Sequence, residues 1–446
     1  MKLILLSGGS GKRLWPISND ARSKQFLKVL WNDCDQVYES MVQRVWRQLE
    51  HVGLEQNTVV TTSKSQAEMI EIQLNNVIKI IEPSRRDTFP AIALSVAYLK
   101  DHMNISDEET IVVSPVDPYV ESSYFENIKK LSEVLTESNT DLALMGVVPT
   151  EPSEKFGYIV PEKKSFGKNE IKKVEKFKEK PNKKEAQELI ESGALWNCGV
   201  FAFKYKTLKK FLDSKGYNYR YDDILNSYEE FPKISFDYEF VEYIESIAVL
   251  PFKGAWEDLG TWGSLTQKLH SNRIGNVISN NNCNKTHIIN ELDIPIVCLG
   301  IDNAIIAASP DGILISNKLE SEKIKDVISS LDDTPMFEER IWGSFKTLDY
   351  VNHGHIEVVT KRVRINKGKK ISYQYHEKRK EIWTILSGEA EVNLDGIVSI
   401  VGSGKVIEID AGVKHSIHAI NNIELIEVQQ GLLEKEDVIR INYQTL

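Results

Sequence analysis

Short apolar runs recur along the first part of the chain, separated by longer amphipathic stretches. The runs are KLILLS, NTVVTT, TIVVSP and DLALMGVV, which begin at Lys2, Asn57, Thr110 and Asp141. Between such runs lie charged stretches, and one of them, KKEAQELIESG, predicts a helix that ends at Gly193. Buried strands that alternate with helices predict an α/β fold, with a doubly wound, mostly parallel sheet covered by helices on both faces.

The pattern changes after residue 270, so we assign the α/β domain to residues 1–270. Residues 271–334 hold short apolar runs broken by Asn, Gly and Asp, which predicts a β-rich segment followed by a linker. Within this segment, LESEKIKDVISSLDD predicts one helix that leads to a linker near Asp333–Pro335.

The last part of the chain alternates apolar and polar residues with a period of two. The stretches KRVRINKGKKIS, EIWTILSGEAEVNLDG and GKVIEIDAGVKHSI show this alternation, with turn residues between them. Alternation at this spacing predicts a small all-β barrel or sandwich, which we assign to residues 335–446.

Composition excludes some classes of partner. The chain of 446 residues suits two or three domains. A formal net charge of −10 argues against nucleic acid or an acidic membrane surface as the main partner, so we expect neither. The four cysteines lack metal-ligand spacing and are expected to be free thiols in a reducing cytoplasm. We also expect neither a signal peptide nor a transmembrane helix.

A glycine-rich turn, SGGSGKR, follows the first apolar run directly. Gly8, Gly9 and Gly11 allow the backbone to approach a ligand closely, often a phosphate, and Lys12 and Arg13 add positive charge beside it.

Two familiar phosphate loops do not fit this turn. Leu14 stands where the dinucleotide fingerprint needs a third glycine, and Leu6 stands where the P-loop needs its first. Taken alone, the turn is most often only a turn, so its chemistry depends on its neighbours.

Three further charged residues suit a nucleotide phosphate. Lys24 follows the turn, Asp117 closes the run IVVSPVD, and Asp258 lies in WEDLGTW after another apolar run. Two carboxylates at strand ends suit Mg²⁺, which prefers one or two carboxylates together with substrate phosphates. The structural alternative is that each Asp caps a helix.

Arg85 and Arg86 form a second candidate anion site. One of these two arginines is expected to be a solvated surface charge.

Residues 1–30 resemble the signature of bacterial long-type mannose-1-phosphate guanylyltransferases, GGxGxRLxPxS followed by PKQF, with Ser23 in place of the first Pro of PKQF. The resemblance continues in order through EPSRRDTFPAIA, PVDPY, GVVPTEPSEKFGYI, FKEKP, LWNCGVFAF, SFDYEFVE and WEDLGTW. It implies transfer of GMP from GTP to mannose 1-phosphate, which gives GDP-mannose and pyrophosphate for glycan or polysaccharide synthesis.

The resemblance also implies a role for each matching residue. The implied catalytic residues are Arg13, Lys24, Asp117 and Asp258, of which the two Asp hold Mg²⁺. The implied GTP-binding residues are Gly8, Gly9, Gly11 and Lys12 at the phosphates, and Arg86, Asp87 and Thr88 near the guanine and ribose. The implied sugar-binding residues are Gly157, Glu179, Lys180 and Asn197. Asp87 replaces the family's usual Asn, and Pro118 its usual His.

The final domain carries Gln374, His376, Glu381 and His415, a set of nitrogen and oxygen ligands suited to Zn²⁺ or another divalent metal. The first three share one face only if the chain bends after His376, and residues 378–379 are a candidate turn. Taken alone, His415 fits a structural role near a β-turn better than a metal ligand.

The surrounding sequence resembles the cupin domain of type II phosphomannose isomerases, through QxHxHRxEHW and AGxxH. Lys378, Ile382 and Ser416 depart from its pattern. The resemblance implies a metal-capable cupin and leaves open whether it interconverts fructose 6-phosphate and mannose 6-phosphate.

Two other functions stay open at this point. One is a nucleotidyltransferase for a related sugar 1-phosphate or another base, and the other is a non-catalytic regulatory paralogue. The second would lack one of the catalytic residues, and this chain keeps all four. We expect the protein to form a homo-oligomer.

Overall fold

The computed structural model describes all residues except 10, 167–169, 332–334, 353, 355, 433–436 and 442–446. The chain forms two compact units: Met1–Leu14 with Ser23–His270, and Trp15–Arg22 with Ser271–Leu446.

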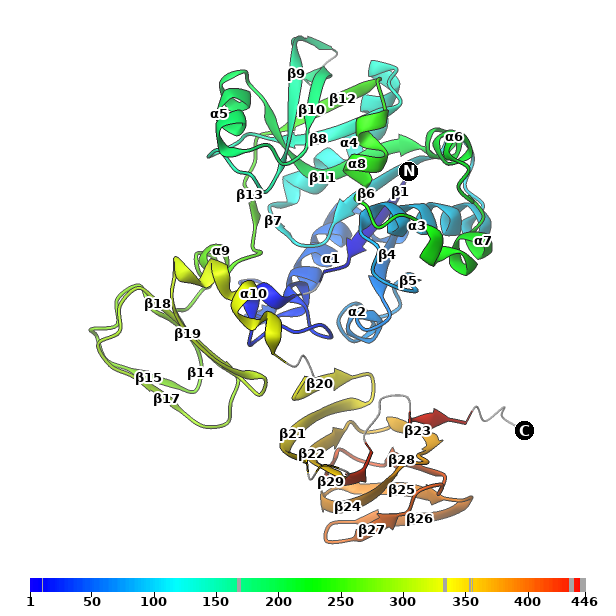
Figure 1. Ribbon diagram of the computed structural model, residues 1–446, viewed down its shortest axis with the longest axis vertical. Helices are drawn as coiled ribbons and strands as arrows, with labels where there is room; N and C mark the ends of the chain where they lie inside the picture. Colours follow the sequence, from blue (N-terminus) through cyan, green and yellow to red (C-terminus); the bar gives the residue numbers. More distant parts are fainter. Residues whose placement is uncertain are drawn as a thin grey trace. The chain divides into compact units, whose positions relative to one another are not determined.

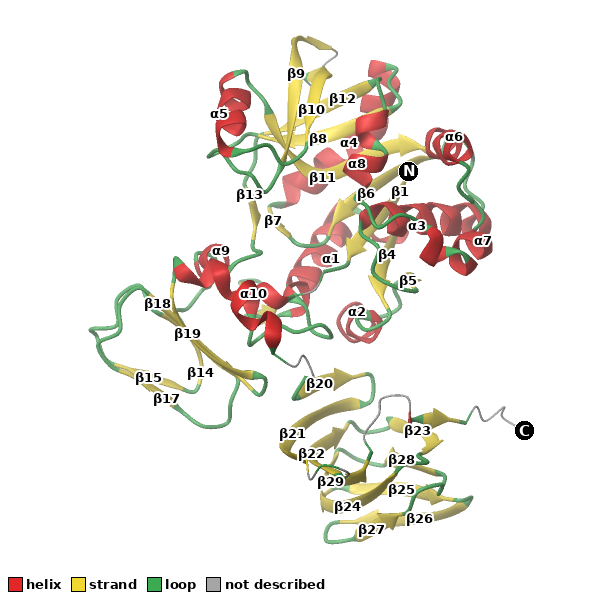
Figure 2. Cartoon of the chain, viewed as in Figure 1, coloured by secondary structure: helices red, strands yellow, loops and turns green. Residues whose placement is uncertain are grey.

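The first unit is built on a nine-stranded sheet in the order β5-β4-β1-β6-β11-β8-β12-β10-β9 (Figures 1 and 2). Its strands are β1 (Lys2–Ser7), β4 (Thr58–Ser63), β5 (Lys79–Glu82), β6 (Thr110–Pro115), β8 (Leu142–Val147), β9 (Gly157–Phe166), β10 (Ile171–Lys178), β11 (Leu195–Lys204) and β12 (Ile247–Phe252). The four apolar runs form β1, β4, β6 and β8. The first four strands of the order are parallel, whereas β11 runs antiparallel to both β6 and β8. The α/β fold class is confirmed, with a mixed sheet.

Helices surround this sheet, and the last of them in chain order lies away from it (Figure 2). They are α1 (Met41–Val52), α2 (Ala67–Leu74), α3 (Thr88–Met103), α4 (Ser122–Ser138), α5 (Lys183–Glu191), α6 (Tyr205–Lys215), α7 (Tyr221–Asn226), α8 (Phe236–Glu239) and α9 (Trp262–Thr266). The predicted helix before Gly193 is α5, which ends where Gly193 adopts a φ of 84°.

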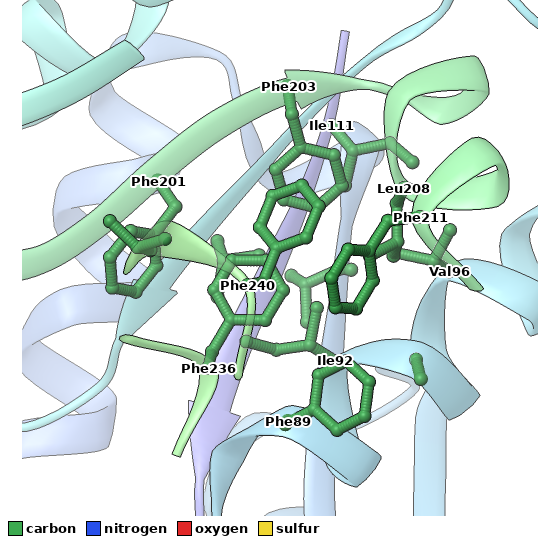
Figure 3. Close-up of a cluster of buried hydrophobic side chains, with 14 of the residues drawn as sticks. Phe89, Ile92, Val96, Ile111, Phe201, Phe203, Leu208, Phe211, Phe236 and Phe240 are labelled. Carbon is green, nitrogen blue, oxygen red and sulfur yellow. The ribbon is translucent and has the colours of Figure 1, made fainter. Parts of the chain in front are cut away.

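A cluster of aromatic and aliphatic side chains joins α3, β11, α6 and α8 (Figure 3). Phe89 and Ile92 come from α3, Phe203 from β11, Phe211 from α6 and Phe240 from the residue after α8. All five are at most 3% exposed, so this cluster fixes α8 against the sheet. That contact is important for the candidate site, because α8 carries one of its side chains.

Two short two-stranded ribbons complete the first unit. They are β2 (Leu30–Asn32) with β3 (Val37–Glu39), and β7 (Pro118–Val120) with β13 (Trp256–Asp258). In the second ribbon Asp258 pairs with Pro118, so the antiparallel register brings Asp258 beside the residue that follows Asp117.

The second unit begins with a β-rich segment. Its strands are β14 (Arg273–Gly275), β15 (Val277–Ser279), β16 (His287–Asn290), β17 (Ile296–Cys298), β18 (Ala304–Ser309) and β19 (Gly312–Asn317). Strands β14, β16 and β18 pair in parallel, as do β15 and β17, which is the pairing expected of stacked coils. Residues Trp15–Arg22 pack on this segment: Asn19 Nδ2 donates to Asp311 Oδ2 at 2.8 Å.

The single helix predicted from LESEKIKDVISSLDD is wrong. The segment forms two 3₁₀ turns, Glu320–Lys323 and Ile328–Ser330, on either side of α10 (Ile324–Val327). Only a few of its apolar residues are buried, since Ile324 and Ile328 are covered and Val327 is 74% exposed. The predicted linker at residues 333–335 lies partly outside the described residues.

The C-terminal part is all β, as predicted. One sheet, in spatial order, contains β20 (Phe337–Arg340), β21 (Gly343–Asn352), β22 (Glu357–Ile365), β29 (Ile423–Gly431), β24 (Arg379–Ser387) and β27 (Val406–Ile409). The other contains β26 (Ile397–Gly402), β25 (Glu389–Leu394), β28 (His415–Ala419), β23 (Lys370–Tyr375) and β30 (Ile439–Arg440). All pairings are antiparallel, and a core that includes Trp383, Ile385, Ile417 and Leu425 lies between the sheets.

All four cysteines are free thiols, as expected. None of the helices in the described ranges is both long enough and apolar enough to cross a membrane.

Candidate functional sites

The glycine turn is held by side chains from neighbouring elements. Gln66 Nε2 donates to the carbonyl of Gly9 at 2.9 Å, and Gln25 Nε2 donates to Ser7 Oγ at 3.3 Å. Gly11 adopts a φ of 57°, a conformation that favours glycine. The described part of the turn is therefore held in place by its surroundings.

The bases of the turn follow immediately. Lys12 and Arg13 lie in a 3₁₀ turn that ends at Leu14, and the Arg13 side chain is exposed. Ser10 lies outside the described residues, so the turn is known on either side of that position.

Lys24 joins the two predicted metal-binding carboxylates. Its Nζ lies 2.7 Å from Asp117 Oδ2 and 2.9 Å from Asp258 Oδ1. Burial opposes the charge on Lys24, but the two carboxylates outweigh burial and raise the pKa of Lys24 above its ordinary value. The charged form of Lys24 is thus favoured by its position between two carboxylates.

Gly260 leaves space beside this ion group. A Cβ at Gly260 would lie 2.9 and 3.0 Å from the two Asp258 carboxylate oxygens and 3.2 Å from Lys24 Nζ. Glycine at this position leaves the Asp258 carboxylate room to face Lys24.

The donor chemistry here fits Mg²⁺. Asp117 and Asp258 each keep 36% of the side chain exposed, and both direct a carboxylate oxygen at the same Lys24 ammonium. Two convergent, partly exposed carboxylates are what Mg²⁺ needs from a protein when phosphates and water complete its ligands.

The segment expected near the guanine is packed against the chain that follows α7. Arg86 Nη1 lies 2.7 Å from Glu229 Oε2, and its Nε donates to the carbonyl of Phe231 at 2.8 Å. Asp87 has a φ of 68° and accepts a bond from the backbone N–H of Thr88 at 2.7 Å, so it caps α3. These contacts give Arg86 and Asp87 structural roles in addition to any ligand contact.

The four residues expected at the sugar lie together at one end of β9 and β11. Asn197 pairs with Gly157 in the sheet register, and a Cβ at Gly157 would lie 2.4 Å from Glu179 Oε2 and 3.3 Å from Asn197 Cβ. Lys180 Nζ lies 3.1 Å from Glu179 Oε1. Burial raises the pKa of Glu179, while Lys180 opposes that rise.

Asp237, in the first turn of α8, belongs to the same cluster and was missed by the sequence analysis. Its Oδ1 accepts a hydrogen bond from Asn197 Nδ2 at 2.6 Å. Burial, reinforced by the charge of Glu179, raises the pKa of Asp237 to about 7. The motif SFDYEFVE contained this residue, but one Asp at a helix start predicts a cap and no more.

Glu82 was also missed, because this stretch of sequence was interpreted from the neighbouring Arg85 and Arg86 as an anion site. It ends β5, is 7% exposed, and its Oε2 accepts a bond from the Tyr228 hydroxyl at 2.8 Å. A Cβ at Gly8 would lie 3.7 Å from the other carboxylate oxygen, so Glu82 lies beside the glycine turn.

In the C-terminal part, His376, Glu381 and His415 converge. Their ligand atoms all lie within 4.8 Å of one another, and all three residues are buried. His376 Nε2 is 3.1 Å from Glu381 Oε1, and His415 Nε2 is 3.6 Å from Glu381 Oε2. The chain bends after β23, as the spacing required, although β24 already begins at Arg379.

The two imidazoles are oriented by backbone carbonyls. His376 Nδ1 is 2.9 Å from the Asp437 carbonyl, and His415 Nδ1 is 2.9 Å from the Val413 carbonyl, which directs both Nε2 atoms inward. His415 Nε2 is buried without a hydrogen-bond partner among the described residues. A buried nitrogen in that state suits a metal ligand, so these residues fit a divalent ion.

Basic groups surround Glu381. Burial works against its charge, but His376, His415 and Arg379 outweigh burial and lower its pKa to about 2. Arg379 Nε donates to Glu381 Oε1 at 3.2 Å, so this arginine contacts the candidate metal ligands.

Gln374, the fourth predicted ligand, does not join this group through any described hydrogen bond. Its amide oxygen accepts from Ser372 Oγ at 3.5 Å. Its main chain nevertheless pairs with His415 in the register of β23 and β28.

Comparison with known proteins agrees with this division of the chain. A model of the family "Nucleotidyl transferase" matches residues 2–272, and one described as "Mannose-6-phosphate isomerase C-terminal" matches residues 334–443.

Several similar relatives span nearly the whole chain. The mannose-1-phosphate guanylyltransferase of Escherichia coli K12 is 28% identical over 98% of this chain and 97% of its own length. The xanthan biosynthesis protein XanB of Xanthomonas campestris is 28% identical over 98% of this chain and 97% of its own length.

The fold of a crystal structure from Thermus thermophilus is also similar. That structure, described as a mannose-1-phosphate geranyltransferase, is 24% identical, with a TM-score of 0.60 over 74% of this chain and 98% of its own. The chain belongs to the nucleotidyl transferase family, in the type that carries a mannose-6-phosphate isomerase C-terminal segment after the transferase.

Proposed function

We propose that the protein is a mannose-1-phosphate guanylyltransferase, which forms GDP-mannose and pyrophosphate from GTP and mannose 1-phosphate. The observation that carries this proposal is the position of Lys24 between Asp117 and Asp258. A cation and two carboxylates that face one point suit phosphoryl chemistry, which depends on positioning and charge neutralisation more than on a covalent nucleophile.

The reaction is a direct displacement at the α-phosphorus of GTP. A phosphate oxygen of mannose 1-phosphate forms the new P–O bond, and the bond to the β-phosphate bridging oxygen breaks, so pyrophosphate leaves with the electron pair. Asp117 and Asp258 would hold Mg²⁺, which would supply positive charge at the reacting phosphates. Lys24 neutralises charge beside the α-phosphate, and Arg13 does so on the departing pyrophosphate.

The remaining transferase residues bind and orient the two substrates. The backbone amides of Gly8, Gly9 and Gly11, with the Lys12 side chain, hold the triphosphate. Arg86, Asp87 and Thr88 form the nucleoside side of the site. Gly157, Glu179, Lys180 and Asn197 hold the sugar, with the buried Glu179 carboxylate accepting from sugar hydroxyls.

A second activity is favoured by one observation, the buried His415 Nε2 that has no hydrogen-bond partner in the described part of the chain and lies beside His376 and Glu381. We propose that these residues hold Zn²⁺ or another divalent ion, with Gln374 as the fourth ligand. The associated reaction is isomerisation of mannose 6-phosphate and fructose 6-phosphate by proton transfer between adjacent carbons. We place the transferase at residues 1–270, the linking segment at 271–334 and the cupin at 335–446, in a homo-oligomer that acts in the cytoplasm.

The test is pyrophosphate release with Mg²⁺ over a grid of four nucleoside triphosphates and several hexose 1-phosphates. Turnover that peaks with GTP and mannose 1-phosphate supports the proposal. A peak elsewhere in the grid would retain the chemistry but assign another sugar or base, and no turnover in any combination would favour the regulatory paralogue.

A further inference from the structure

Among the described residues expected at the sugar, one buried carboxylate oxygen accepts no hydrogen bond. Glu179 Oε1 is 3.1 Å from Lys180 Nζ, but Glu179 Oε2 is buried and has no hydrogen-bond partner among the described residues. The Glu179 side chain is only 6% exposed. Leaving a buried carboxylate oxygen unpaired costs about 1–3 kcal/mol, so this atom points to a ligand that donates a hydrogen bond.

The Asn197 side chain lies beside the same residue, Gly157, as this carboxylate oxygen. Gly157 lies against both side chains, because a Cβ added to it would be 2.4 Å from Glu179 Oε2 and 3.3 Å from Asn197 Cβ. A side chain at residue 157 would collide with the Glu179 carboxylate, so glycine lets Glu179 lie close to the β9 backbone beside Asn197. A ligand hydroxyl that reaches both side chains can donate to Glu179 and accept from an Asn197 amide hydrogen.

Asn197 can donate in this way only if its amide group has a fixed orientation, and Asp237 supplies that constraint. Asn197 Oδ1 accepts from the backbone N–H of Gly199 at 3.1 Å, while Asn197 Nδ2 donates to Asp237 Oδ1 at 2.6 Å. The carboxylate and the glycine amide together determine which end of the amide is the donor. One amide hydrogen is used by Asp237, and the second meets no acceptor among the described residues, so it can serve a ligand.

The position of Asp237 is itself fixed. Ser235 caps α8 by accepting from the backbone N–H of Tyr238, and Phe236 and Phe240 on either side of Asp237 are fully buried in the aromatic core. The carboxylate is therefore presented to Asn197 by a packed helix, and it does not depend on a loop.

We infer that Asp237 is a positioning residue that gives the transferase its selectivity for one sugar hydroxyl, by holding Asn197 as a donor opposite the acceptor Glu179. This inference rests on the proposed function. A hexose 1-phosphate that lacks the recognised hydroxyl would leave Glu179 Oε2 and the Asn197 donor unpaired, and is rejected for that reason.

The experiment compares wild type, Asp237→Ala, Asp237→Asn and the surface control Asp222→Ala, with GTP and a panel of monodeoxy analogues of mannose 1-phosphate. Asp237→Ala is expected to raise the KM for mannose 1-phosphate by about 10-fold or more and to leave the KM for GTP within about 2-fold. Asp237→Asn keeps an oxygen acceptor and should restore the sugar KM to within about 3-fold of wild type. With wild type, kcat/KM for one deoxy analogue should be about 100-fold or more lower than kcat/KM for mannose 1-phosphate. In Asp237→Ala this ratio should be at least about 10-fold smaller.

Some results would overturn the inference. Asp237→Ala with unchanged sugar KM and unchanged discrimination would do so, as would an equal rise in both KM values or no rescue by Asn. If thermal unfolding shows that Asp237→Ala does not fold, Asp237→Leu replaces it, since Leu is similar in size and also lacks an acceptor. Failure of the proposed function is a separate outcome, because it would appear as absence of wild-type turnover with mannose 1-phosphate.

Discussion

Lys24 Nζ lies 2.9 Å from Asp258 Oδ1, although 234 residues separate the two along the chain. The antiparallel ribbon of β7 and β13 brings Asp258 beside Asp117, the other carboxylate that contacts Lys24, because it pairs Asp258 with the residue that follows Asp117. The three charged groups therefore meet through a short ribbon that lies outside the nine-stranded sheet. That arrangement underlies the first two predictions.

Lys24→Met should lower kcat by about 100-fold or more, because it removes the cation beside the reacting phosphates and leaves the two carboxylates facing each other. The raised pKa of Lys24 means that its charge is complete below its ordinary value of 10.5 and is lost only as the pH rises through the higher folded value. In the protein without Mg²⁺, NMR of Lys24 should therefore show no titration between about pH 6 and pH 9. Steady-state rates of pyrophosphate release measure the loss of kcat, and a variant with near wild-type kcat would remove Lys24 from the mechanism.

Gly260→Ala should reduce transferase activity by about 10-fold, because the new methyl group would displace the Asp258 carboxylate from Lys24. The matched control is Gly263→Ala in α9, whose Cβ would meet only Thr261 Oγ1 at 3.8 Å, an ordinary contact. Both variants are compared by kcat and by thermal unfolding. Equal activity in the two variants would show that the room that Gly260 leaves for the Asp258 carboxylate does not affect catalysis.

Tyr228→Phe should destabilise the protein by about 1–3 kcal/mol, because it leaves the buried Glu82 carboxylate without its hydroxyl donor. Burial already raises the pKa of Glu82, so its ionised form lowers stability as the pH rises above the ordinary value of 4.5. Without the hydroxyl this pKa rises further, and the loss should be larger at about pH 8 than at about pH 5. Chemical denaturation at both pH values measures the difference, with the surface variant Tyr219→Phe as control. A loss that is equal at both pH values would show that Glu82 is not the affected group.

His415→Gln should abolish binding of a divalent metal to the C-terminal part, whereas His418→Gln should not. Both residues lie on β28, but His415 is buried beside Glu381 and His418 is exposed on the opposite face. Metal content after dialysis against Zn²⁺, measured by mass spectrometry, should be one ion per chain in wild type and in His418→Gln. Transferase rates should be unchanged in both, and a metal content that His415→Gln does not lower would exclude this site.

Much of the fold could be predicted because strands and helices differ in apolar period. The runs that begin at Lys2 and Thr110 form β1 and β6 as expected. Strand direction could not be predicted in the same way. The run LWNCGVFAF has the same apolar pattern whether it runs parallel or antiparallel, and β11 is antiparallel to both neighbours.

Part of the candidate site also lies beyond sequence reasoning. Motif resemblance identified Glu179 and Asn197, which the structure brings together around Gly157. Asp237 accepts a hydrogen bond from Asn197, which lies 40 residues earlier in the chain. This contact depends on where the aromatic core places α8. No local pattern encodes that pairing.

The most direct test of the central claim is ³¹P NMR of the wild-type protein with GTP, mannose 1-phosphate and Mg²⁺. We predict that the signals of both substrates fall together, while pyrophosphate and a sugar-linked diphosphate appear in equal amounts. Consumption of GTP to GDP and inorganic phosphate, with mannose 1-phosphate unchanged, would contradict it.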